Sequence, residues 1–77
     1  MLIFMNEYVI HLNWDPEADV WIASSDVIPG FIMESGSYDA LVERVRYAVP
    51  ELLKLNNLPD ENILLYFKSE RHERAYA

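Results

Sequence analysis

Apolar and polar residues alternate near the start of the chain, which is the pattern of a strand with one buried face. The apolar positions are Tyr8, Ile10, Leu12 and Trp14. The positions between them are mixed in character: Glu7, Val9, His11 and Asn13. We predict a first strand over residues 3–14. The segment 15–19 then forms a turn, because Pro16 fixes a backbone angle and Asp15 can accept hydrogen bonds from nearby amides.

A second strand is predicted over residues 20–25, and it alternates in the same way. Its two faces are Val20 with Ile22, and Trp21 with Ala23. The dipeptide Pro29-Gly30 then stops the strand, and a type II turn at this point needs a positive φ at Gly30. A short third strand follows over residues 31–34, and Gly36 closes it. The first three strands are therefore expected to form an antiparallel meander.

The pattern then changes to helical spacing. Ser37 is a typical N-cap residue, and Asp39 in the first turn suits the helix dipole. The apolar stripe consists of Tyr38, Leu41, Val42, Val45, Val49, Leu52 and Leu53. Pro50 lies within this stripe, where it removes a backbone donor, so we predict a kink or a break near residues 46–49. The stripe continues beyond the proline, which favours a kink. The helix is expected to end at Asn56-Asn57.

The last apolar segment is the continuous run Ile63-Leu64-Leu65-Tyr66-Phe67. Such a run predicts a strand that is buried on both faces, and hence either central in the sheet or covered by a neighbouring subunit. The charged tail, residues 69–77, either extends this strand or frays. The order β-β-β-α-β predicts a single α+β domain over residues 1–77. In it, the meander and the fourth strand form one layer and a kinked helix forms the other.

The chain is short for the apolar surface that it carries. It has 77 residues, of which 52% are hydrophobic, and it has no cysteine. Domains below roughly 70–80 residues rarely gain more than about 3–5 kcal/mol from one core. No disulfide or thiolate metal site can add to that stability. We therefore predict a homodimer or higher oligomer, in which the subunits bury apolar surface that one subunit alone would leave exposed.

Charge is distributed unevenly along the chain, whose net charge is −7. Residues 1–43 contain eight acids and neither Lys nor Arg. These acids are Glu7, Asp15, Glu17, Asp19, Asp26, Glu34, Asp39 and Glu43. Such a surface repels nucleic acid, because affinity for phosphates comes mostly from Lys and Arg. It attracts a basic protein, although the same acidity could serve solubility alone.

The N-terminal residues lack the basic segment and the cleavage site of a signal peptide. No apolar run approaches the roughly 20 residues that a membrane span needs. The sequence therefore predicts a cytoplasmic protein that does not contact a membrane.

Carboxylates near the hairpin are the only group of residues that could support chemistry. Asp15, Glu17 and Asp19 are spaced like part of a calcium loop, but the glycine and the distal acid of that motif are missing. With Asp26, these acids could instead hold the divalent ion of a minimal metal-dependent nuclease. We favour a solvated turn. His11 has no second histidine or cysteine at ligand spacing, so we expect no metal, no cofactor and no catalysis.

Trp14 and Trp21 flank the same turn. They either pin the hairpin by cross-strand packing or serve as exposed interface anchors. We favour a structural role for at least one of them, since so small a core needs large side chains. The candidate partner-binding residues are Trp14, Asp15, Glu17, Asp19, Trp21 and Asp26.

The run from Trp14 to Gly30 resembles the N-terminal domain of HicB-type antitoxins. It is similar, more closely, to a family of small stand-alone prokaryotic proteins of uncharacterised function that share that fold. The segment Val49-Pro50-Glu51-Leu52-Leu53 also resembles that stand-alone family. The resemblance implies a partial ribonuclease-H-like fold that forms oligomers and blocks a small basic RNA-cleaving toxin. It transfers no catalytic acids, and the C-terminal DNA-binding domain of full antitoxins is not expected here. A purely structural oligomer is a further alternative.

Overall fold

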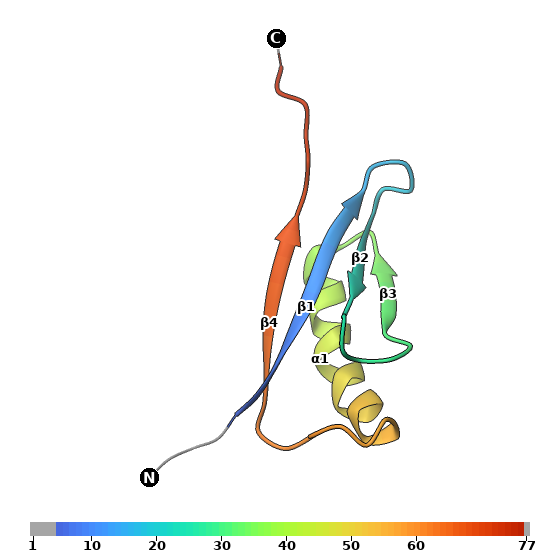
Figure 1. Cartoon of the computed structure of the whole chain (residues 1–77). Helices are drawn as coiled ribbons and strands as arrows, with labels where there is room; N and C mark the ends of the chain where they lie inside the picture. Colours follow the sequence, from blue (N-terminus) through green and yellow to red (C-terminus); the bar gives the residue numbers. More distant parts are fainter. Residues whose placement is uncertain (1–4, 77) are drawn as a thin grey trace.

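The computed structural model describes residues 5–76, which form one sheet with a helix against one of its faces (Figure 1). The elements are β1 (Asn6–Asp15), β2 (Val20–Ser24), β3 (Ile32–Ser35), α1 (Tyr38–Leu55) and β4 (Ile63–Glu70). Within the described residues the sheet has four strands in the order β3-β2-β1-β4. This arrangement confirms the predicted α+β fold and its element order.

The first three strands form the predicted antiparallel meander, and β4 lies parallel to β1. A parallel neighbour requires a crossover, and α1 supplies it between β3 and β4. In the hairpin register, Leu12 lies opposite Ala23 and Trp14 lies opposite Trp21. The predicted first strand began at residue 3. Residues 3 and 4 lie outside the described part of the chain, in which β1 begins at Asn6.

The hairpin turn is held by the side chain that the sequence indicated. The Oδ1 atom of Asp15 accepts from the backbone N–H of Glu17 at 3.0 Å and from that of Ala18 at 3.4 Å. Asp19 completes the turn with a φ of 55°. The carboxylate of Asp15 is therefore occupied with local structure, and Glu17 and Asp19 are the exposed acids of the turn.

The turn between β2 and β3 is of type II, as predicted. The N–H of Phe31 donates to the carbonyl oxygen of Ile28 at 3.3 Å, and Gly30 has a φ of 74°. Pro29 fixes the first central position of this turn and glycine fills the second. The Oγ atom of Ser25 accepts from the N–H groups of the two residues that precede Pro29, at 3.2 and 3.3 Å.

Replacing Gly30 with valine should lower the free energy of unfolding by about 1–3 kcal/mol, because a β-branched residue is strained at positive φ. An added Cβ meets no atom within 4 Å, so the backbone conformation alone carries this cost. Urea denaturation measures the effect. Gly30→Asn is the matched control, since asparagine tolerates this conformation and should retain most of the stability. Equal unfolding midpoints for the two variants would contradict the assignment.

The helix begins after Ser37, the predicted N-cap, and continues through Pro50. The Oγ atom of Ser37 accepts from the N–H of Ala40 at 3.2 Å, and Asn56 caps the other end. The fully buried helix residues lie on both sides of Pro50: Leu41, Val45, Val49 and Leu53. Because this stripe packs on the sheet along its whole length, the helix is one continuous segment and the predicted break does not occur.

The core lies between α1 and the face of the sheet formed by β1 and β2. Its buried residues are Tyr8, Ile10, Leu12, Ala23, Ile28, Phe31, Leu41, Val45, Val49 and Leu53. Among the described residues, no polar or charged side chain is buried. The alternating apolar positions of the first strand, read from the sequence, are therefore the core positions of β1 with the exception of Trp14, which is half-buried.

The fourth strand is not central, which corrects one of the two predictions for the run from Ile63 to Phe67. It forms an edge of the sheet, with Leu64 44% and Tyr66 49% exposed. The helix packs closer to β2 and β3 than to β4, so one face of this strand is only partly covered and the other is open. The strand continues to Glu70, and residues 71–76 lie outside it.

Candidate functional site

The tryptophans of the hairpin pack against the start of the helix. Trp14 and Trp21 meet edge to face, with ring centroids 5.5 Å apart and an angle of 61° between the rings. Trp21 meets Tyr38, at the start of α1, in the same way at 5.0 Å. The register places both indoles on the helix side of the sheet, where they are half-buried. Trp21 thus joins the hairpin to the helix.

The segment that follows β4 also contacts Trp14. The guanidinium carbon of Arg71 lies 4.1 Å from the centroid of the Trp14 ring, a cation–π arrangement. Nearby, the hydroxyl groups of Tyr38 and Ser69 are hydrogen-bonded at 2.8 Å. Both tryptophans therefore contact other parts of their own chain, and their role in partner binding stays a prediction.

The acids singled out from the sequence do not come together. Asp15 lies opposite Val20 at the start of β2 and Asp26 follows the end of that strand, whose length is about 13 Å at the usual rise per residue. Asp26 instead pairs with His11, at 3.1 Å between Oδ2 and Nε2. In residues 5–76 no group of three or more His, Cys, Asp or Glu side chains is placed to hold a metal ion. The hairpin acids that the sequence singled out therefore do not form one cluster with Asp26.

The side of the sheet away from α1 carries a group of apolar residues that sequence reasoning missed as a site. We call this side the open face. Its apolar residues are Val9, Val20, Ile22, Ile32, Leu64 and Tyr66. Ile32 is 72% exposed, and the other five are partly or substantially exposed. The signal was present in the sequence, because these residues occupy alternate positions opposite to the core positions of each strand.

Carboxylates surround the apolar residues of the open face. Glu7 lies opposite Leu64 on the adjacent strand, and Glu34 lies opposite Ile22. The acidic residues on or beside this face are Glu7, Asp15, Asp26, Glu34 and Glu70. Of the basic residues, the strand registers place Lys68 on this face. Its ammonium lies 5.7 Å from the centroid of the Tyr66 ring. The open face therefore has an apolar centre and a negative rim.

Such a face is suited to binding a partner. An apolar patch rimmed by polar residues is characteristic of a protein–protein interaction site. In the described residues, no helix is long and apolar enough to span a membrane.

The fold and the open face together define a small α+β domain with one sheet face left uncovered. The chain belongs to a family described as a domain of unknown function, DUF1902, whose model matches residues 7–77. It is similar to a hypothetical protein, TTHA1013, from the extremely thermophilic bacterium Thermus thermophilus. The TM-score is 0.79 at 30% sequence identity, and the match covers 91% of this chain and all of the other. No curated protein matches the chain at a significant level.

Proposed function

We propose that this protein is a non-catalytic binding module whose open face takes up a small basic protein. The apolar centre of that face, with its rim of carboxylates, is the observation that carries the proposal. Burial of Ile32, Leu64 and Tyr66 would supply affinity, since these are the most exposed apolar residues of the face. The rim would supply attraction and orientation for a positively charged partner.

The negative rim also sets the kind of partner. Nucleic acid is disfavoured because phosphate contacts need Lys and Arg. Residues 1–43, which contribute three of the four strands, contain neither of these residues. A basic protein is favoured instead, because the electrostatic field of the acidic face raises the rate at which the two proteins meet. The exposed turn acids Glu17 and Asp19 add to this field from the end of the hairpin.

The finer proposal is that the module acts like an antitoxin and masks a small basic toxin. Its support is the resemblance of the run from Trp14 to Gly30 to HicB-type antitoxins, together with the acidic open face. The family and structural matches carry no activity of their own. Co-expression with the product of the adjacent reading frame tests this proposal. A short basic product that co-purifies and loses its toxicity would support it, and an unrelated neighbour would contradict it.

Charge reversal on the open face should slow capture of that basic product. The variant Glu7→Lys with Glu34→Lys places two cations beside the apolar centre. We expect the association rate at low salt to fall about tenfold or more, because steering by an acidic face accounts for gains of that order. Stopped-flow or surface-based kinetics at several salt concentrations would measure this. High salt screens the charges, so the association rates of the variant and the parent should become more alike.

The matched control carries the same change in net charge on the helix. Glu43→Lys with Glu51→Lys alters two exposed acids of α1, on the opposite side of the sheet. This variant should keep most of the association rate. An equal loss in both variants would show that net charge, and not the open face, governs capture. Magnesium-dependent cleavage of RNA by the pure protein, abolished by Asp26→Asn, would overturn the binding proposal in favour of a nuclease.

A further inference from the structure

The two edges of the sheet are protected to different extents against pairing with another strand. The β3 edge is four residues long, and Arg44 donates from Nη1 to the carbonyl oxygen of Glu34 at 3.1 Å. Short edges and charged side chains are common protections against strand pairing. The β4 edge is eight residues long. Within residues 5–76 no strand lies beyond it and no side chain bonds to its backbone.

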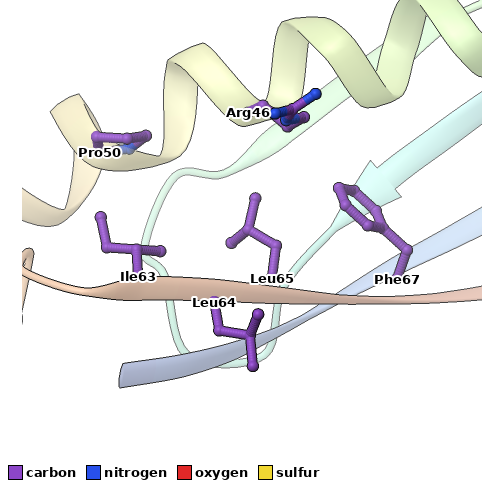
Figure 2. Close-up of a pocket in the computed structure, with 6 residues that line it drawn as sticks. All are labelled: Arg46, Pro50, Ile63, Leu64, Leu65 and Phe67. Carbon is purple, nitrogen blue, oxygen red and sulfur yellow. The ribbon is translucent and has the colours of Figure 1, made fainter. Parts of the chain in front are cut away.

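An apolar groove runs along the same unprotected edge. It has a volume of about 350 Å³ and lies between β4 and α1. Its lining residues are Arg46, Pro50, Ile63, Leu64, Leu65 and Phe67. Figure 2 shows Ile63, Leu65 and Phe67 pointing from the strand toward the helix, and Leu64 pointing to the other side. Both faces of this edge strand are therefore apolar and incompletely covered.

We propose that a second copy of this chain occupies this edge, with the two β4 strands paired antiparallel about Tyr66. The pair would form one continuous eight-stranded sheet, and each copy would close the groove of the other. Self-association at β4 does not depend on the basic partner proposed for the open face.

Backbone geometry fixes which sides of the two copies match. The N–H of Asn6 donates to the carbonyl oxygen of Asn62 at 2.9 Å, so the even-numbered residues of β4 bond to β1. The odd-numbered residues alternate with these even-numbered ones, so the backbone groups of Ile63, Leu65 and Phe67 point to the free edge. A ladder between copies needs these odd-numbered residues opposite one another. Directly opposite residues share a face, so both helices lie on the same side of the joined sheet.

Strand overlap and apolar contact then select one register from the allowed ones. With Tyr66 opposite Tyr66 of the second copy, residues 63–69 of the two strands pair and Leu65 lies opposite Phe67. Centring the pair on Leu65 would shorten the ladder to residues 63–67, and centring it on Phe67 would place Leu65 opposite Ser69. The Tyr66 register therefore combines the longer ladder with an apolar cross-strand pair.

A cross-link tests the register directly, because the chain contains no cysteine. Residues opposite each other outside the hydrogen-bonded pairs have Cα atoms about 4.5 Å apart, within reach of a disulfide. Under mild oxidation, Tyr66→Cys should give about tenfold more disulfide-linked dimer than Tyr47→Cys at equal protein concentration. Tyr47 is the matched control, since it is a tyrosine on α1 with 74% of its surface exposed.

Sedimentation equilibrium gives the second measurement. At micromolar concentration the parent should sediment at twice its subunit mass of 9.0 kDa. Tyr66→Lys places two like charges at the symmetry axis and should weaken the dimer about tenfold, whereas Tyr47→Lys should not. A parent that remains monomeric would overturn the proposal. So would a dimer that is unaffected by Tyr66→Lys and is not captured by Tyr66→Cys, because it would use another surface.

Discussion

Replacing Ile10 with alanine should lower the free energy of unfolding by about 2–5 kcal/mol, the range for deleting a fully buried aliphatic side chain. Ile10 has no exposed surface and lies in β1, which has a strand on each side and the helix above. Deleting its side chain leaves a cavity that packed neighbours on all sides cannot fill. Since a domain of this size retains only about 3–5 kcal/mol from its core, the variant should be largely unfolded at 37 °C.

Circular dichroism during thermal and urea denaturation measures this loss, at one fixed protein concentration so that association does not differ between variants. Val9→Ala is the matched control. Val9 precedes Ile10 on the same strand but lies on the open face, where it is half-exposed. Its truncation should shift the unfolding midpoint much less. Equal shifts would mean that the open face is covered as fully as the core in solution.

Local signals predicted most of the fold. The alternation in the first strands, the acidic turn with Asp15, and the turn at Gly30 each depend on residues close together in the sequence. The same is true of the helix, whose cap at Ser37 acts on the N–H of Ala40. Of the kink or break predicted at Pro50, the break does not occur, because the local cost of the proline is offset by an apolar stripe that stays buried on both sides of it.

Long-range placement could not be read from the sequence. The run from Ile63 to Phe67 is apolar on both faces whether it lies at the centre or at an edge. Only the strand order, in which β4 pairs with β1 alone, decides this. The contact of Arg71 with Trp14 joins residues far apart in the chain and has no local signature. The alternation in each strand marked the residues of the open face, but only the strand registers show that they meet in one patch.

The two proposed surfaces reinforce each other in one assembly. Pairing at β4 keeps both helices on one side of the joined sheet, so the two open faces become continuous on the other. Leu64 and Tyr66 of each copy would then lie at the middle of the enlarged face. A dimeric module would present its basic partner with twice the acidic rim, which increases electrostatic steering.

Replacing Trp21 with alanine is expected to lower the free energy of unfolding by about 2–3 kcal/mol, less than for a fully buried tryptophan. The substitution removes the ring contacts to Trp14 at 5.5 Å and to Tyr38 at 5.0 Å, which join the hairpin to the helix. Near-ultraviolet circular dichroism should lose the signal of the packed indoles, and urea denaturation gives the free energy.

Trp21→Phe and Trp14→Ala separate this structural role from a role in partner binding. The phenylalanine variant keeps an aromatic ring near Tyr38 and should recover more than half of the loss. Trp14 lies at the outer end of the cluster, beneath Arg71, so its truncation should cost less than that of Trp21. If Trp21→Ala left stability unchanged but abolished capture of the basic partner, the pair would be interface anchors, and the hairpin end rather than the open face would be the binding site.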